Sequence, residues 1–126
     1  MRDKRFPKPI VEAVHATQII GIRAGMRPQR FIGVWAVVAN GRVFVRPWTN
    51  RPRSWYRVFL EDPRGAIQVA GRTRRVRAAA RRGERLLDAI DRGYREKYSR
   101  PYQRNFVRGF ARPRRRAWTL ELMPSA

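Results

Sequence analysis

The dipeptide Asn40-Gly41 constrains the fold of this chain more than any other local signal, because it stands between two apolar segments. Asparagine and glycine both tolerate positive φ, which a two-residue hairpin turn requires. The preceding stretch FIGVWAVVA (31–39) is apolar on both faces, as a central strand should be. In the stretch that follows, Val43 and Val45 share one face. The pattern predicts a β-hairpin with its turn at this dipeptide.

The rest of the chain predicts a small α+β fold. Further strands are expected at 17–24, 65–71, 74–80 and 116–124, with a turn at 25–29. Helices are expected at 83–98, at 53–62 behind an N-cap at Ser54, and in an N-terminal lead-in over 1–16. About six strands with two or three short helices suit one domain, residues 1–126, whose sheet curls into a small barrel.

The charge of the chain is strongly unbalanced. It has 27 arginines and 3 lysines against nine acidic residues, which gives a formal net charge of +21. A positive field of this size attracts polyanions such as nucleic acids. A genome rich in G and C would explain the preference for arginine over lysine, but not the excess of cations. Because 43% of the residues are hydrophobic and four are tryptophan, we expect a packed core rather than a disordered basic chain.

The segment 99–116 is the densest basic stretch and holds no acidic residue. Some of its arginines recur every fourth residue, which in a helix gives a slowly wrapping stripe. Pro113 is expected to end that helix. The candidate polyanion-binding residues are Arg100, Arg104, Arg108, Arg112, Arg114, Arg115 and Arg116. A solvated face above a small apolar contact is the alternative interpretation, and the sequence leaves both open.

The chain lacks the residue patterns of common enzyme and metal sites. It has no cysteine, one histidine (His15) and scattered carboxylates, so we expect no metal site. No G-x-S-x-G pattern and no glycine-rich phosphate loop of the Walker or Rossmann type occurs. Any catalysis would therefore depend on a cofactor, and no catalytic residue can be assigned. The apolar runs are shorter than the roughly 20 residues that span a bilayer, and no cleavable signal stands out, so a cytoplasmic protein is expected.

The loop RPWTNRPR (46–53) joins a predicted strand to the N-terminus of a predicted helix. Free N–H groups and the helix dipole favour an anion at such a position. Arginine adds a planar fork that binds two phosphate oxygens at once. Its interleaved arginines and aromatic rings also suit a nucleic acid, whose bases stack on such rings. The loop is therefore a candidate phosphate site, with a cofactor or a nucleic acid as the ligand.

The order of several short motifs resembles a known group of proteins. The motifs are Trp35-Ala36-Val37-Val38, Val43-Phe44-Val45-Arg46, Trp55-Tyr56 and Tyr94-Arg95-Glu96-Lys97-Tyr98. They resemble, in the same order, the motifs of an uncharacterised bacterial domain-of-unknown-function family. That family is allied to the split barrels of the pyridoxamine-phosphate oxidase and deazaflavin-dependent nitroreductase type. The resemblance extends over residues 31–124.

The resemblance implies a fold, a cofactor and a set of site residues. The fold would be a split β-barrel of the FMN-binding type, usually a homodimer with its cofactor sites at the subunit interface. The function would be that of a flavin- or deazaflavin-binding, oxidoreductase-like protein, with FMN or a deazaflavin as cofactor. The implied cofactor-binding positions are Arg46, Trp48, Thr49, Asn50, Arg51, Arg53, Trp55 and Tyr56. For Trp55 and Tyr56, packing of the helix onto the barrel is the alternative.

Two other functions stay open at this point. One is a nucleic-acid-binding module that uses the basic surface. The other is a split-barrel dimer that has no cofactor and binds a protein partner.

Overall fold

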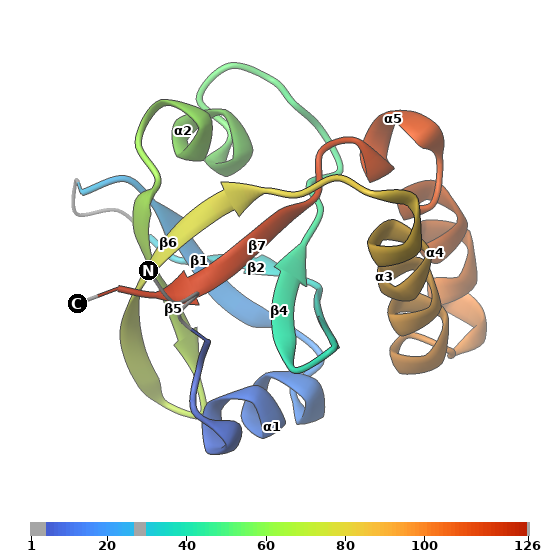
Figure 1. Ribbon diagram of the computed structural model, residues 1–126, viewed down its shortest axis with the longest axis horizontal. Coiled ribbons are helices and arrows are strands. Elements are labelled where there is room, and N and C mark those ends of the chain that lie inside the picture. Colours follow the sequence, from blue (N-terminus) through green and yellow to red (C-terminus); the bar gives the residue numbers. More distant parts are fainter. Residues whose placement is uncertain (1–4, 27–29, 126) are drawn as a thin grey trace.

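Seven strands form one antiparallel sheet that curls into a nearly closed barrel in the computed structural model (Figure 1), which describes residues 5–26 and 30–125. The order across the sheet is β2-β1-β5-β6-β7-β4-β3. The strands are β1 (Ile20–Ala24), β2 (Ile32–Val34), β3 (Ala36–Ala39), β4 (Arg42–Val45), β5 (Arg64–Val69), β6 (Arg72–Ala80) and β7 (Leu120–Pro124). The predicted α+β barrel is confirmed. Residues 1–4 of the expected lead-in and 27–29 of the expected turn lie outside the described residues.

Trp35 divides the segment 31–39, which the sequence predicted as one strand. Before it, β2 pairs with β1, and after it, β3 pairs with β4 at the other end of the sheet order. The alternation of faces continues through the break, because Val34 and Ala36 both belong to the barrel core. A strand that closes a barrel must change partners, and this tertiary requirement produces the division.

The hairpin predicted at Asn40-Gly41 is confirmed. The two residues have φ angles of 54° and 72°, the left-handed values that a type I′ turn requires at both of its central positions. Ala70 and Gly71 repeat this geometry between β5 and β6, with φ angles of 53° and 72°. Both turns therefore join strands that pair directly with one another.

Two helices close the ends of the barrel, α1 (Lys8–Ala16) at one end and α2 (Trp55–Glu61) at the other (Figure 1). Val14 of α1 and Phe59 of α2 are buried in the cluster that fills the barrel. Ser54 is the N-cap of α2 as predicted, because its hydroxyl accepts a hydrogen bond from the backbone N of Arg57 at 3.3 Å. Gly65 permits the close approach of α2, since a Cβ there would stand 2.7 Å from Cε1 of Phe59.

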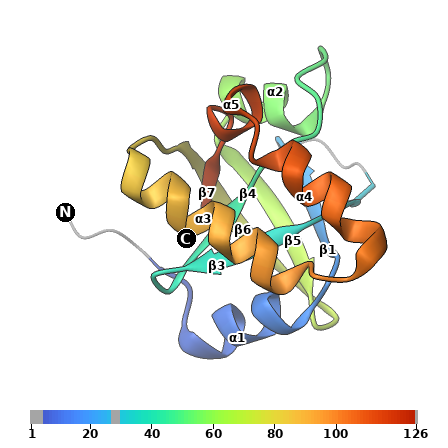
Figure 2. The same ribbon diagram turned by 90° about the vertical axis from the view of Figure 1, so that its right-hand side faces the viewer.

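Helices α3 (Glu84–Lys97) and α4 (Arg104–Phe110) lie side by side on one outer wall of the barrel (Figure 2). Between helices and wall lies a second apolar cluster, in which Val37 and Phe44 of the sheet meet Ile90 and Tyr94 of α3. The helix predicted at 83–98 is confirmed. No helix in the described parts of the chain is long and apolar enough to cross a membrane.

The basic segment 99–116 forms three short pieces rather than one helix. They are the 3-10 turn η1 (Pro101–Gln103), α4, and α5 (Pro113–Arg116). The preceding helix ends before Pro113 as predicted, at Phe110, and Arg112 directly before the proline is extended. Pro113 also begins α5, because the first position of a helix needs no N–H donor. The last strand consequently begins at Leu120, later than the predicted 116.

Strand β7 carries a buried carboxylate, Glu121, whose residue is only 4% exposed. Its oxygen Oε1 accepts hydrogen bonds from Nη2 of Arg42 at 2.7 Å and from Nε of Arg81 at 2.8 Å. Burial raises the pKa of this carboxyl, but the hydrogen bonds from Arg42 and Arg81 outweigh burial and hold the pKa below its usual range. The group therefore stays ionised inside the fold and ties β7 to β4 and to the end of β6.

Candidate functional site

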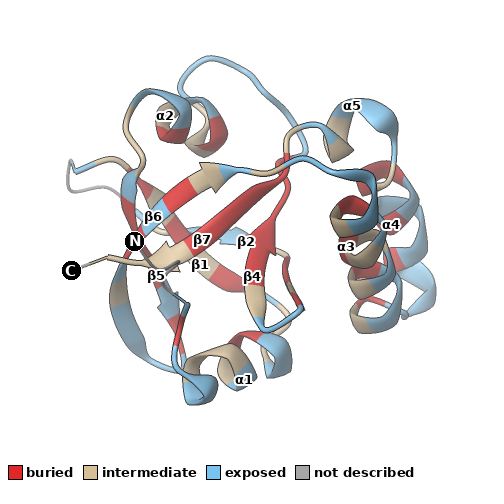
Figure 3. Cartoon of the chain, in the orientation of Figure 1, coloured by how far each residue is buried: buried red, intermediate tan, exposed pale blue. Residues whose placement is uncertain are grey.

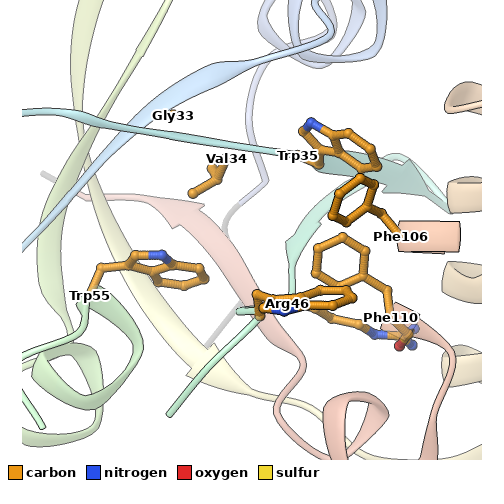
Figure 4. Close-up of a pocket in the computed structure, with 8 residues that line it drawn as sticks. Gly33, Val34, Trp35, Arg46, Trp55, Phe106 and Phe110 are labelled. Carbon is orange, nitrogen blue, oxygen red and sulfur yellow. The ribbon is translucent and has the colours of Figure 1, made fainter. Parts of the chain in front are cut away.

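An aromatic cleft of about 310 Å³ opens where the break between β2 and β3 meets α4, the loop after β4 and the start of α2. Figure 4 shows its lining, with Trp55 on one side and Trp35, Phe106 and Phe110 on the other. Val34 points into the space between them. The residues that line the cleft are Gly33, Val34, Trp35, Arg46, Trp48, Trp55, Phe106 and Phe110.

The wall around Trp35 is held rigidly by ring contacts. The indole stacks on the buried ring of Tyr98, with the two centroids 4.4 Å apart and the planes at 5°. The rings of Phe106 and Phe110 lie 5.8 Å and 6.0 Å from the same indole. Phe110 in turn stacks on Tyr94 at 4.9 Å, so the wall rests on α3. Such pairs add about 0.5–1.5 kcal/mol each beyond burial, which favours a preformed surface.

Trp48 extends this wall and is held from two sides. Its indole lies against Gly109 of α4, where a Cβ would stand 2.6 Å from Cζ3 of the ring. On the ring lies the guanidinium of Arg115, 3.8 Å from the centroid. The same side chain donates from Nε to the carbonyl oxygen of Trp48 at 2.9 Å. Trp48 remains 45% exposed, so its free surface is available to a ligand.

Trp55 forms the opposite wall from the first turn of α2. It is half-buried, and its ring meets Phe59 edge-on at 6.4 Å, which fixes it against the barrel core. Its neighbour Tyr56 does not reach the cleft, because its buried ring packs on Trp118 at 5.8 Å. Burial raises the pKa of the Tyr56 hydroxyl, although Arg57 and Arg82 lower it in part. Of the two predicted aromatic residues of this helix, Trp55 therefore faces the cleft and Tyr56 does not.

The guanidinium of Arg46 is bound inside the protein. The side chain has no exposed surface, and its Nη1 donates to Oδ1 of Asp91 at 2.5 Å. The same guanidinium also donates hydrogen bonds from Nε to Oγ1 of Thr119 at 2.8 Å, from Nη1 to the carbonyl oxygen of Phe110 at 3.0 Å and from Nη2 to that of Leu87 at 3.3 Å. A phosphate could reach this guanidinium only by displacing these acceptors. The prediction that Arg46 binds phosphate stays a prediction, and this geometry disfavours it.

The remaining predicted residues lie on the exposed loop that leads into α2 (Figure 3). Oγ1 of Thr49 accepts a hydrogen bond from the backbone N of Arg51 at 3.3 Å, which folds the loop back on itself. Arg53 has a φ angle of 69°, an uncommon conformation for a residue with a side chain. All four residues, Thr49, Asn50, Arg51 and Arg53, are exposed.

The chain matches a bacterial protein family. A family model described as "Uncharacterized protein conserved in bacteria (DUF2255)" matches residues 10–122, a range that contains every residue of the cleft. The chain is a member of the DUF2255 family.

Among the solved structures that match this DUF2255 chain is one of a bacterial protein of the same fold. The crystal structure of the conserved hypothetical protein Rv2991 from Mycobacterium tuberculosis superposes with a TM-score of 0.57 at 15% sequence identity. The match covers 100% of this chain and 84% of that chain. At this identity the likeness shows the fold alone. No curated protein matches the chain.

The basic segment of this DUF2255 protein divides into bound and exposed arginines. Arg116 donates to carboxylates of α3, from Nε to Asp91 at 3.0 Å, from Nη2 to Asp88 at 2.7 Å and from Nη1 to Glu84 at 3.3 Å. Arg115 holds Trp48, as described above. Both are therefore used within the fold. The exposed members of the predicted set are Arg100, Arg104, Arg108, Arg112 and Arg114.

Five lining residues of the cleft were not predicted, namely Gly33, Val34, Trp35, Phe106 and Phe110. The four-residue spacing of Phe106 and Phe110 was a usable signal, because it places both rings on one face of a helix. Nothing in the sequence pairs that face with Trp35. In the described residues no cluster of three or more histidine, aspartate or glutamate side chains could hold a metal ion.

Proposed function

We propose that the aromatic cleft binds the flat ring of a phosphorylated cofactor of the flavin class, FMN or a deazaflavin. The observation that carries the proposal is the pair of facing walls, with Trp55 on one side and the rings of Trp35, Phe106 and Phe110 on the other. Ligand sites are typically concave, mostly apolar and largely preformed, and they carry a few charged groups that fix orientation. The resemblance to the split barrels supports the same class of ligand.

The size of the cleft suits part of such a cofactor. Its volume of about 310 Å³ lies at the lower end of ligand pockets, so it accommodates the ring system and leaves the phosphate outside. Gly33 contributes only backbone to the lining of the cleft. A Cβ at that position would stand 2.8 Å from Cγ2 of Ile19, which lies outside the lining, so the glycine makes room for Ile19.

The phosphate of the ligand would bind on the loop rather than at Arg46. Arg51 and Arg53 are exposed on the segment that begins at the cleft residue Trp48 and ends at the cleft residue Trp55. Their guanidinium groups are free of side-chain hydrogen bonds in the part of the chain that the structure describes. Arginine forks of this kind match phosphate oxygens with two parallel hydrogen bonds.

The cleft would contribute binding and exclusion of water. Its lining includes no carboxylate, histidine, serine or lysine, so the side chains in it neither attack a substrate nor transfer a proton. A bound flavin or deazaflavin supplies hydride or electron transfer by its own chemistry. The substrate and any oxidoreductase activity follow from which cofactor binds.

Titration of the purified chain with FMN, a deazaflavin nucleotide and riboflavin tests the proposal. We expect quenching of tryptophan emission and co-elution of the phosphorylated ligands. Trp55→Ala should weaken binding by about 1–3 kcal/mol, the range for a base stacked on an aromatic side chain. Trp118→Phe is the matched control, because Trp118 packs on Tyr56 outside the cleft lining.

Riboflavin separates the ring from the phosphate. Replacing Arg51 and Arg53 together by alanine should weaken FMN binding and leave riboflavin binding unchanged. Absence of quenching by every ligand at tens of micromolar, or equal affinity in wild type and Trp55→Ala, would refute the proposal. Light scattering of the same samples measures whether the chain forms the homodimer that the resemblance implies.

A further inference from the structure

The outer wall formed by β1, β5 and β6 is positively charged. These three neighbouring strands hold six arginines and no acidic residue. The acidic groups lie mostly elsewhere, with Glu84, Asp88, Asp91 and Glu96 on α3 and Glu121 buried. Figure 1 shows α3 on the opposite side of the barrel from the β5–β6 hairpin. The fold therefore separates its charges across the barrel.

The strand register determines which arginines face outward. Ile22, Ile67 and Val76 belong to the barrel core, so the alternate positions on their strands point away from it. Arg23 lies opposite Ala66, which lies opposite Arg75 on the next strand, and Arg64 lies opposite Arg77. We call the four outward residues Arg23, Arg64, Arg75 and Arg77 the arginine wall.

The four arginines are close enough to repel one another. Neighbouring strands lie about 4.8 Å apart and alternate residues on one strand about 6.7 Å apart, so each arginine has another of the group within about one Debye length at physiological salt. Like charges directly opposite on neighbouring strands are destabilising, and Arg64 and Arg77 form such a pair. An anion between them would relieve this repulsion.

The fold provides little compensation for this charge. Asp62 accepts two hydrogen bonds from the guanidinium of Arg64, at 3.0 Å and 3.1 Å. Arg75 and Arg77 are exposed, and their side chains make no hydrogen bond or ion pair within the described residues. Arg23 is half-buried and lies 4.5 Å from the ring centroid of Phe31. The hydrogen bonds from Arg64 lower the pKa of the Asp62 carboxyl most, and the charge of Arg77 helps to lower it further. One carboxylate therefore compensates part of the charge of four arginines, and the wall keeps a net positive charge.

The surface between the arginines is low. The positions beside them are Gly21, Ala66, Gln68 and Thr73, all short or polar. Ala66 is buried between its neighbours, and Phe31 covers the edge beside Gly21 and Arg23. The helices pack elsewhere, with α1 and α2 at the barrel ends and α3 and α4 on β3 and β4. On this face Arg64, Gln68, Thr73, Arg75 and Arg77 are exposed. An extended chain could therefore lie flat across the strands.

We infer that the arginine wall binds the sugar-phosphate backbone of a nucleic acid. The partner must repeat its negative charges over a distance, because the arginines form rows across three strands rather than a cup around one anion. Each arginine fork can bind one phosphate through two oxygens. Contacts of this kind carry no sequence preference and release counterions, so binding weakens steeply with salt. This surface is separate from the aromatic cleft and needs no cofactor.

Fluorescence anisotropy of the full chain with a labelled oligonucleotide, single-stranded and duplex, tests the inference. Arg75→Ala/Arg77→Ala should weaken binding on the order of tenfold at moderate salt and reduce the slope of log K against log salt by about 2. The matched control is Arg112→Ala/Arg114→Ala, which removes the same charge from exposed positions of the basic segment. We expect the control to retain affinity within about threefold.

Three outcomes would overturn the inference. They are absence of binding by wild type at low salt, equal weakening in both double variants, and a larger loss in the control. Tighter binding to phosphatidylserine vesicles than to the oligonucleotide, lost in Arg75→Ala/Arg77→Ala, would assign the wall to a membrane surface instead.

Backbone chemical-shift changes in β5 and β6 on adding the oligonucleotide to wild type test the same contact without any substitution. Arg75→Lys/Arg77→Lys, which keeps the charge, should retain most of the affinity.

Discussion

Gly109 lies against the indole of Trp48, so closely that a Cβ at this position would stand 2.6 Å from the ring. Gly109 is the last but one residue of α4, where glycine is still a poorer helix former than alanine, and the sequence offers no local reason for it. The reason is a contact between α4 and a loop far away in the chain. The space left by the missing side chain of Gly109 lets Trp48 lie beside Phe106 and Phe110 in the cleft.

Gly109→Ala should leave the free energy of unfolding nearly unchanged, because two effects oppose each other. Alanine gains helix propensity, at most about 1 kcal/mol so close to the end of α4. Displacement of the Trp48 ring loses ring contacts worth about 0.5–1.5 kcal/mol. In a Trp48→Ala background only the gain remains, so Gly109→Ala should then stabilise by up to about 1 kcal/mol. Urea unfolding of the wild type, the two single variants and the double variant measures these free energies as a double-mutant cycle. Equal stabilisation in both backgrounds would show that the indole does not rest on Gly109.

Asp91→Ala should destabilise the fold by about 3–5 kcal/mol, the usual cost of leaving one partner of a buried ion pair uncompensated. The carboxylate holds the fully buried guanidinium of Arg46 and also accepts from Arg116. Asp88→Ala is the control on the same helix, since its side chain is 63% exposed and such a pair contributes at most about 1 kcal/mol. Chemical unfolding compares the two.

Similar small losses in both variants would contradict the structural role of Arg46. The guanidinium would then be available to a ligand, as the sequence predicted. Repeating the FMN titration with Asp91→Ala would show whether a phosphate takes the place of the carboxylate.

The stability of the protein should fall in acid partly through Glu121. Its pKa is lower in the folded protein than in the unfolded chain, so the unfolded state takes up the proton first. The stabilisation is complete above about pH 4.3, the usual glutamate value, and is lost as the pH falls through the folded pKa. Unfolding free energies between neutral and acidic pH measure this loss. Glu121→Gln should show a smaller decrease, whereas an unchanged pH dependence would exclude Glu121 as its source.

Much of the fold could be predicted because its signals are local. The turn at Asn40-Gly41, the cap at Ser54 and the apolar spacing of α3 each depend on residues within one turn or one strand. The division of a strand at Trp35 could not be predicted, since it depends on closing the barrel. Pro113 was correctly predicted to end the helix before it, but the start of α5 at the same residue was not predicted, because a proline is compatible with both roles.

The candidate site was only partly predictable for the same reason. Trp48 and Trp55 could be assigned to a ligand site because they flank a basic loop at a helix N-terminus. The arginine of that stretch, Arg46, was indistinguishable in sequence from an exposed cation. Its partner Asp91 follows 45 residues later, and no periodicity connects the two.

By itself, the sequence determined the class of fold, the hairpin turns, the chief helix and a large excess of positive charge. The tertiary structure decided how these cations are used. Ion pairing and burial occupy Arg46 and Arg116, ring stacking holds Arg115, and the strand register leaves Arg75 and Arg77 exposed. Composition fixes only the number of charges, whereas the electrostatic free energy of each depends on distances of a few ångströms. Those distances exist only after the barrel has brought remote segments together.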